Sequence, residues 1–347
     1  MQSLIDEWKY VINSKFIFAI FIGPLIGALF FGFMFSHNQL NESPVAVIDE
    51  DHSAYSAQLI GKMNASQYMK VVDIYPGPMD PATLLANGKV VAVIVLPSQL
   101  EQRKLQGLSS NIGILMDNTM PSGLTGIRTA IQEIVTTENM TLSMTKLLRS
   151  GMDPDAARGI VSPLSLQQRL LFNPTSSYVD FMVIGFVNII TLMILLGAAG
   201  SIALRLRKDG RLFENGLSPF QFWIRSVPYA LLNTLSSMLS YGVLKQFGHL
   251  RFETEPYIFV VPVLIYSFAL TLLGMLIGYT AKDTSKISTR ASFIVYPSFL
   301  ATGVQITPLI FPMFFQIAAY PLPMNWLNRL IRGMALRGQD LSAFGLE

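Results

Sequence analysis

The spacing of charged residues constrains this chain more than any other feature. No ionisable side chain occurs between Phe16 and Phe35, a stretch of twenty residues. Charge then returns for roughly 140 residues and disappears again in four long stretches between Phe181 and Asn328. A run of about 20 apolar residues matches the hydrocarbon thickness of a bilayer, about 30 Å. The pattern therefore predicts a polytopic α-helical membrane protein with one large water-exposed domain inserted after its first span.

Composition excludes several classes of function. Only 14% of the residues are charged, against about 25% in soluble proteins, and the mean hydropathy is +0.44. The net charge of +3 is too small and scattered for nucleic-acid binding, and the absence of cysteine excludes disulfides and thiolate chemistry. The first apolar stretch is too long for a signal peptide and no Ala-x-Ala-like site follows it, so we expect an uncleaved anchor.

We expect five spans. The predicted ranges are 16–35, 181–204, 227–244, 257–281 and 291–303. After Arg290 no charge occurs for 38 residues, but five prolines interrupt this stretch. Such a stretch predicts an outer, partly re-entrant segment over residues 305–338, which ends in a short amphipathic helix, Asn325–Leu336.

Basic residues in the short segments give the orientation. With a cytoplasmic N-terminus, ten of them lie inside and five outside. Residues 37–176 are then extracytoplasmic, residues 1–36 form the N-terminal helix and first span, and residues 177–347 form the rest of the transmembrane domain.

The extracytoplasmic region has the pattern of a small α/β domain. Short Val- and Ile-rich runs at 45–48, 70–74, 90–96 and 111–116 predict strands. Helical spacing separates them at 53–63, 81–86 and 98–105. This alternation favours a partly parallel sheet. A helical stalk over 122–171, interrupted near Gly151–Pro154, leads back to the membrane.

Motifs for catalysis or metal binding are weak in this sequence. The cluster Asp49-Glu50-Asp51-His52 fits a helix start capped by Asp51 or Ser53 better than a metal site. Neither Gly-Lys pair, at 61–62 or 88–89, has the remaining residues of a phosphate-binding loop. We therefore predict no enzyme active site, no metal and no cofactor in this chain.

The predicted spans contain few polar groups. Asn188, Thr191 and Asn233 are the main ones, and they fit substrate contacts and helix–helix hydrogen bonds equally well. No ionisable residue lies at mid-span, which disfavours a carrier driven by protons or sodium. The pairs Gly23/Gly27 and Gly274/Gly278 have the spacing of close helix packing.

The cytoplasmic segment Arg205–Arg225, which we call the elbow, mixes basic, acidic and aromatic residues. Its composition predicts an amphipathic helix at the membrane interface. It could be a lipid-facing turn without a partner, but as the largest cytoplasmic loop it is also where an external motor could dock, and we favour docking.

The order of these parts resembles the ABC-2 type exporter permeases over nearly the whole chain. The resemblance depends on ordered motifs, none specific alone: Pro44–Ser53, Leu84–Pro97, Asp117-Asn118, Phe172–Pro174, Phe181-Met182, Pro228-Tyr229, Pro321–Pro323, Arg332-Gly333 and Leu336–Gly338.

The resemblance implies that the elbow docks on a separate ATPase, which holds the ATP and magnesium. In the family an acidic residue precedes a Gly-Thr pair there, whereas here Arg211 follows Asp209-Gly210 and Glu214 is a substitute candidate. Ser218 and Pro219 complete the expected coupling elbow. The family has a sixth span after the Arg-Gly segment, which this chain lacks before Glu347.

Further partners follow from the same resemblance. They are a second permease subunit, identical or different, and a periplasmic adaptor, with a drug-like or lipidic amphiphile as cargo. The competing hypotheses are a membrane-anchored binding or scaffold protein without transport activity, and a secondary carrier.

Overall fold

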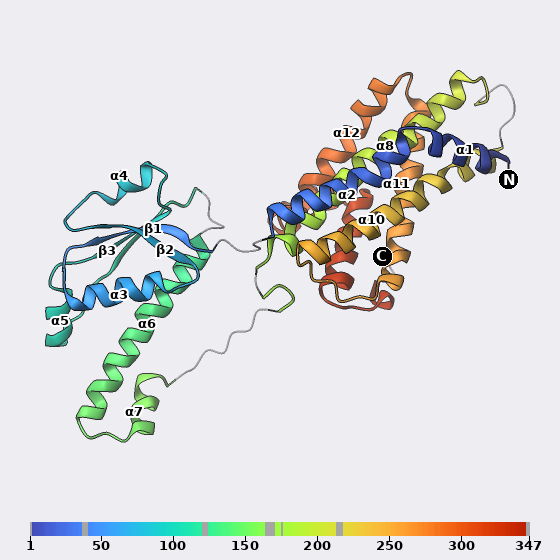
Figure 1. Ribbon diagram of the computed structural model, residues 1–347. Helices are drawn as coiled ribbons and strands as arrows, with labels where there is room; N and C mark the ends of the chain where they lie inside the picture. The colour runs from blue at the N-terminus through green and yellow to red at the C-terminus, as the bar shows by residue number, and fades with distance from the viewer. Residues whose placement is uncertain are drawn as a thin grey trace. The chain divides into compact units, whose positions relative to one another are not determined.

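The computed structural model describes residues 2–36, 41–119, 124–163, 171–174, 176–212 and 218–344. The chain divides into two units (Figure 1). The bundle unit comprises residues 1–39 and 169–347, and the sheet unit comprises residues 40–168. The predicted extracytoplasmic domain, residues 37–176, stays a prediction as to its limits and its side of the membrane.

The bundle unit is helical. Its helices are α1 (Gln2–Asn13), α2 (Phe16–Met34), α8 (Ile184–Lys208), α9 (Pro219–Trp223), α10 (Val227–Phe247), α11 (Pro256–Thr280), α12 (Thr284–Ala301), α13 (Met313–Ala318) and α14 (Pro323–Leu330). Wider π-helical turns precede α8, at Val179–Val183, and follow α14, at Ile331–Leu336. Short 3-10 turns lie at Ile224–Ser226, Pro308–Ile310 and Leu341–Phe344.

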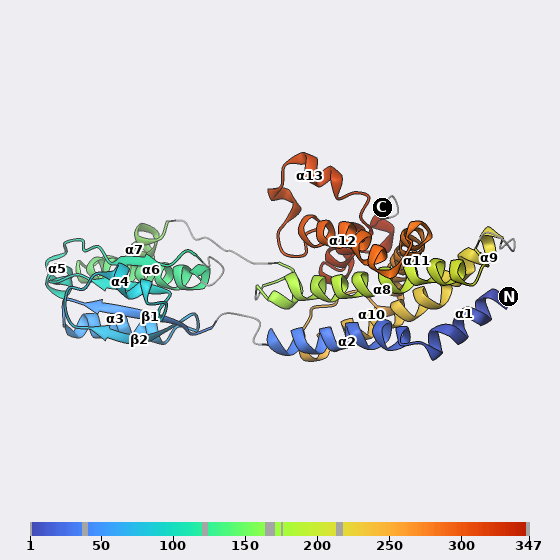
Figure 2. The ribbon, with the colours of Figure 1, turned by 90° about the horizontal axis from the view of Figure 1, so that it is seen from above.

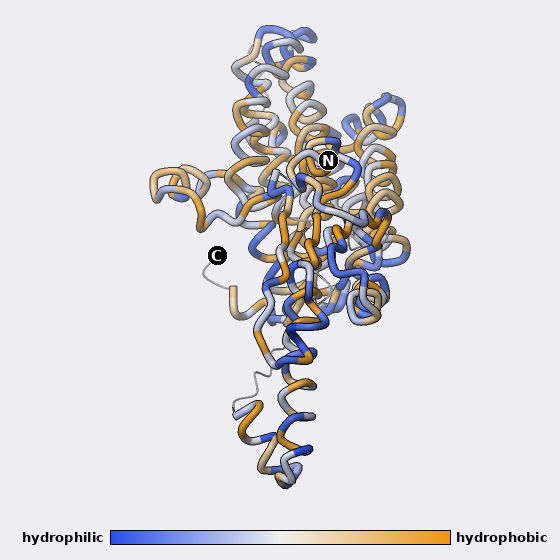
Figure 3. Tube along the Cα trace, turned by 90° about the vertical axis from the view of Figure 1, so that its left-hand side faces the viewer, coloured by the Kyte–Doolittle hydropathy of each residue, from blue (hydrophilic) through white to orange (hydrophobic). Residues whose placement is uncertain are grey.

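Three of the described helical segments are long and apolar enough to cross a membrane. They are Phe16–Met34, Val179–Lys208 and Pro256–Thr280. Hydrophobic residues run along the helices of this unit, and hydrophilic residues gather at turns (Figure 3). The chain is thus a polytopic membrane protein.

The other two predicted spans stay predictions. Helix α10 has 21 residues, but buried serine, threonine and asparagine side chains lower its hydropathy. Helix α12 begins at Thr284, before the predicted span start at Ala291, and so includes Lys286 and Arg290.

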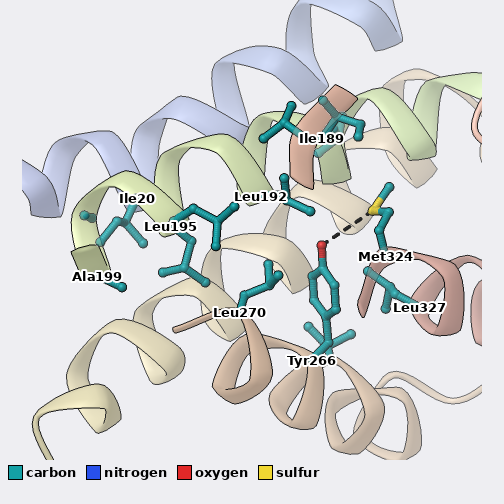
Figure 4. Packing of buried hydrophobic residues seen from close by; sticks show 14 of the residues in the cluster. Ile20, Ile189, Leu192, Leu195, Ala199, Tyr266, Leu270, Met324 and Leu327 are labelled. Carbon is teal, nitrogen blue, oxygen red and sulfur yellow. Dashed lines mark hydrogen bonds between the residues drawn. The ribbon is translucent and has the colours of Figure 1, made fainter. Parts of the chain in front are cut away.

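Helix α8 is the centre of the bundle, since it contacts α2, α10, α11 and α12. Figures 1 and 2 both show α2, α8 and α10 side by side. In Figure 4, Leu192 and Leu195 of α8 pack near Leu270 of α11, and the Tyr266 hydroxyl points to the Met324 sulfur, 3.5 Å away. This hydrogen bond joins α11 to α14, which pack against each other.

Glycines allow α8 and α11 to approach closely. A Cβ atom added at Gly278 would lie 2.0 Å from the Gly200 carbonyl oxygen, and one at Gly274 would lie 3.0 Å from that of Leu196. Neither backbone oxygen can move aside without moving the helix. The predicted packing role of the Gly274/Gly278 pair is therefore present in the structure.

The sheet unit contains a four-stranded sheet in the order β2-β1-β3-β4. The strands are β1 (Ser43–Asp49), β2 (Met69–Tyr75), β3 (Ala92–Leu96) and β4 (Gly113–Met116). Strand β1 runs parallel to β2 and β3, with Val45 opposite Ala92, whereas β4 is antiparallel to β3. All four predicted strands and the partly parallel arrangement are present.

Alternating side chains of the strands build a core on each face of the sheet. Val45 and Val47 belong to one core, which α3 (Ala54–Asn64), α5 (Leu100–Gln106) and α6 (Leu124–Arg149) cover. Ala46 and Ile48 face α4 (Pro81–Ala86). In Figure 1, α3 and α6 lie on the side of the sheet opposite α4.

The region predicted as a helical stalk forms two helices among the described residues, and its role as a connection to the membrane stays a prediction. Helix α6 packs on the sheet through its first half, where Ile127 and Ile131 are buried. The chain then turns at Ser150–Asp153, as predicted, and α7 (Pro154–Val161) packs back on α6 (Figure 1).

Candidate functional site

The elbow after α8 is a turn followed by a short helix. Helix α8 ends at Lys208, Asp209 follows it, and Gly210 adopts a left-handed φ of +65°. This conformation lets the Arg211 amide donate a 2.9 Å hydrogen bond to the Leu206 carbonyl, which closes the helix end. The prediction of one amphipathic helix over Arg205–Arg225 is therefore wrong, because α8 itself continues to Lys208.

The second half of the elbow is capped on its own. Ser218 accepts a hydrogen bond from the Gln221 amide, the Gln221 side chain accepts one from the Ser218 amide, and Pro219 occupies the first turn of α9. Helix α9 continues through a 3-10 turn into α10. Glu214, the predicted substitute contact, lies outside the described residues.

Beside the elbow, Glu7 of α1 is fully buried and binds two arginines. Its carboxylate pairs with Arg205 of α8 and with Arg225 of the turn before α10, the latter at 2.7 Å. The Tyr229 hydroxyl donates a further hydrogen bond of 3.0 Å. We call Glu7, Arg205, Arg225 and Tyr229 the Glu7 junction.

The junction carries more positive charge than negative. Two guanidinium groups share one carboxylate, and the Arg205 Nη1 and Arg225 Nε atoms are buried without a hydrogen-bond partner in the described structure. The Tyr10 ring lies 3.4 Å from the Arg205 guanidinium carbon. The carbonyl groups at the C-terminus of α8 and this ring face favour the excess cation.

A third arginine extends the junction to α11. Arg207 donates hydrogen bonds to the Tyr279 and Ala281 carbonyls at the C-terminal end of that helix. The last turn of α8 thus contacts α1 through Arg205 and α11 through Arg207. Side chains on a single helical turn therefore link α8 to the middle of α1 and to the end of α11, and through Glu7 to the start of α10.

Glu7 was not among the residues predicted from the sequence. A signal was present, because Leu4, Glu7 and Val11 share one face of α1 at helical spacing, and Val11 is also fully buried. An acid on the buried face of an amphipathic helix needs a cationic partner. Its partners lie 198 and 218 positions away, so local pattern alone does not identify them.

Helix α9 exposes aromatic rings next to the elbow. Phe220 is 62% exposed and Trp223 is 44% exposed, and their rings stack at 6.1 Å. Trp223 also stacks on Phe268 of α11 with nearly parallel planes. The elbow thus offers an apolar surface adjacent to the buried arginines.

The polar residues of the spans form hydrogen bonds within the bundle. Asn188 accepts a 2.6 Å bond from the Tyr241 hydroxyl, which joins α8 to α10. Asn233 donates a 2.8 Å bond to Ser267, which joins α10 to α11. Thr191 bonds the Val187 carbonyl of its own helix. These contacts favour the helix-packing alternative, and a role in substrate passage stays a prediction.

The acidic cluster of the sheet unit has capping roles. Ser53 is the N-cap of α3, as predicted. The Asp51 carboxylate accepts hydrogen bonds from the Leu100 and Glu101 amides at the start of α5. Burial raises the pKa of Asp51, but bonds from Ser53 and these amides outweigh it, so the pKa lies below its usual value. Asp49 accepts from the Asp51 and His52 amides.

Comparison with known proteins agrees with this architecture. Residues 14–344 match the ABC-2 family transporter protein profile. The chain belongs to the ABC-2 transporter family. The inner membrane transport permease YhhJ of Escherichia coli (strain K12) is 22% identical over 344 residues, which cover 96% of this chain and 87% of that protein. The permease of the same name from Shigella flexneri matches equally.

No solved structure matches the chain. Membership of the ABC-2 family makes this chain the membrane subunit of a transporter. The resemblance inferred from the sequence is thereby confirmed.

Proposed function

We propose that this chain is the permease of an ATP-driven exporter in a bacterial inner membrane. It moves a hydrophobic or amphiphilic compound out of the cytoplasm or the inner leaflet, with a separate ATPase as its motor. The N-terminus and the elbow face the cytoplasm, the sheet unit lies outside, and five spans cross the bilayer. Two permease subunits pair, and a periplasmic adaptor contacts the sheet unit.

The Glu7 junction is the observation that carries this proposal. A motor that moved α9 would act on Arg225, and through Glu7 on α1 and α8, because one carboxylate binds both arginines. Arg207 would pass the same displacement to α11. Buried ion pairs have discrete partners and do not stretch continuously, so the helix ends would move together.

Charge distribution supports an external source of energy. Helices α2 and α11 contain no Asp, Glu, Lys, Arg or His, and the basic residues of α8 lie in its last turn. A secondary carrier would need a titratable group at mid-membrane depth. Apolar walls with few fixed charges suit an amphiphilic cargo.

The test is reconstitution with an ABC ATPase from the same organism. The permease and the ATPase are purified together and placed in lipid discs, and ATP hydrolysis is measured with and without the permease. Glu214→Ala, Arg211→Ala and Ser218→Ala alter the elbow, and Glu7→Gln alters the junction. Lys245→Ala, in the last turn at the other end of α10, is the matched control.

We expect the elbow variants to weaken binding of the ATPase, and Glu7→Gln to leave binding intact while permease-dependent hydrolysis falls. Lys245→Ala should do neither. If no ATPase binds the chain under any condition, the exporter proposal fails and the alternative of a membrane-anchored binding or scaffold protein gains.

A further inference from the structure

The sheet unit contains a hollow of about 890 Å³ that the proposed transport mechanism does not use. It lies between α3, α5, β4 and α6, all within one unit. This volume is in the range of small-molecule sites, about 300–1,000 Å³. The hollow is partly open to the surface, so a ligand can enter it from solvent.

The hollow has an apolar part beside its polar groups. Leu59, Leu100, Ile114, Ile131 and Val135 line it. Leu59 and Ile131 belong to the core that covers this face of the sheet, so the hollow opens directly onto that core. The apolar part of a ligand bound here would be removed from water and would pack against side chains that the fold holds in place.

Among the charged side chains that line the hollow, one lysine has no described carboxylate partner and can bind an anionic ligand. Glu138 is already neutralised by Lys62 and accepts a 3.2 Å hydrogen bond from the Tyr55 hydroxyl. Lys104 instead lies over the Tyr55 ring, its Nζ atom 3.2 Å from the centroid, and no described carboxylate pairs with it. Polar groups of Ser109, Asn111 and Asn139 lie in the same lining.

Tyr55 is held between these two charges. Its hydroxyl is fixed on Glu138 and its ring face is under Lys104, so the ammonium has a defined position at the hollow. An ammonium with no carboxylate beside it attracts an anionic group, and the neutralised Glu138 does not oppose one.

We propose that this hollow binds an anionic amphiphile, with the acidic head on Lys104 and the apolar body along Leu59, Ile131 and Val135. Binding requires neither ATP nor the motor, so this proposal goes beyond the transport function. The ligand-binding proposal can be correct if the transport proposal is wrong, and wrong if the transport proposal is correct.

Decanesulfonate is the probe, and decyltrimethylammonium of equal chain length is its cationic counterpart. The chain has no cysteine, so Ser109→Cys introduces a single thiol for a trifluoromethyl tag at the hollow. The ¹⁹F resonance of the full chain in lipid discs is followed during titration, and dialysis gives the free probe concentration.

We expect a saturable shift with decanesulfonate and none with the cation. Lys104→Gln should weaken binding about tenfold, as loss of one charge-assisted contact predicts. Lys89→Gln removes an exposed lysine elsewhere in the sheet unit and should leave affinity unchanged. Val135→Trp fills the hollow and should abolish binding while the tagged domain keeps its unfolding temperature.

The absence of a saturable shift in the parent protein overturns the proposal. So does equal affinity for the two probes, or equal affinity of Lys104→Gln and Lys89→Gln. If Val135→Trp does not fold, comparison of Lys104→Gln with Lys89→Gln still tests the proposal, because each substitution removes one positive charge from the sheet unit.

Discussion

Arg225 donates a 2.7 Å hydrogen bond to Glu7, 218 positions earlier in the chain, and both side chains are buried. The first helix is thereby held at the start of α10, where Arg205 of α8 reaches the same carboxylate. Helix α1 is thus bound to both ends of the elbow, Arg205 and Arg225.

Replacing Glu7 should destabilise the bundle more than any exposed charge change. Glu7→Gln leaves two guanidinium groups buried without an anion, which costs about 3–5 kcal/mol for a broken buried pair. SDS-induced unfolding in mixed micelles measures the change. Asp6→Asn, which removes the adjacent carboxylate on α1, should cost under about 1 kcal/mol. Equal effects of the two variants would show that the junction contributes no specific stability.

Gly278 should tolerate no side chain. Gly278→Ala places a Cβ atom against the Gly200 carbonyl and forces α8 and α11 apart, at a cost of about 1–3 kcal/mol or more. Gly197→Ala on α8 meets no atom within 4 Å and should be neutral or slightly stabilising. Thermal unfolding in detergent compares the two. An unchanged midpoint for Gly278→Ala would contradict the close crossing.

Asp51 should make the stability of the sheet unit depend on acid pH. Its pKa is lower in the folded than in the unfolded state, so its contribution is complete above the unfolded pKa and is lost as pH falls through the folded pKa. Calorimetry should find that Asp51→Asn lowers the unfolding temperature at pH 7. This difference should narrow below about pH 4. Asp73→Asn, exposed on β2, controls for net charge.

A difference between Asp51→Asn and the parent protein that stayed constant from pH 7 to pH 3 would contradict this assignment. It would mean that the aspartate acts through its shape and not through its charge.

Asn188 and Tyr241 should act as a packing pair. In a double-mutant cycle of Asn188→Leu and Tyr241→Phe, we expect a coupling energy of about 0.6 kcal/mol, with about 1.7 as an upper value for membrane proteins. Transport by the folded single variants should stay near that of the parent. A variant that unfolds normally but no longer transports would instead place Asn188 on the substrate path.

The proposed orientation can be tested with single cysteines in this cysteine-free chain. Ser109→Cys in the sheet unit should react with a membrane-impermeant maleimide in spheroplasts. Ser218→Cys in the elbow should react only after the cells are opened, because the basic residues of the short segments predict a cytoplasmic elbow. The reverse labelling pattern would invert the topology.

Local patterns determined much of this protein. The apolar runs around Ile20, Leu192 and Leu270 predicted α2, α8 and α11, because about 20 apolar residues in helical form suit a bilayer. Short Val- and Ile-rich runs, such as Val45–Ile48, predicted all four strands. Ser53, one of two predicted caps, and the spacing of Gly274 and Gly278 were also local signals, although the helix that the glycines contact was not predicted.

The tertiary structure alone decided which distant groups meet. Glu7 finds Arg205 and Arg225, and Lys104 faces Tyr55, only after helices far apart in the sequence pack together. A hydropathy profile shows only that a side chain is charged. The free energy of burying that charge depends on its partner. A partner 198 residues away produces no periodic pattern in the sequence. For the same reason the sequence could predict a coupling elbow but not the carboxylate that holds it.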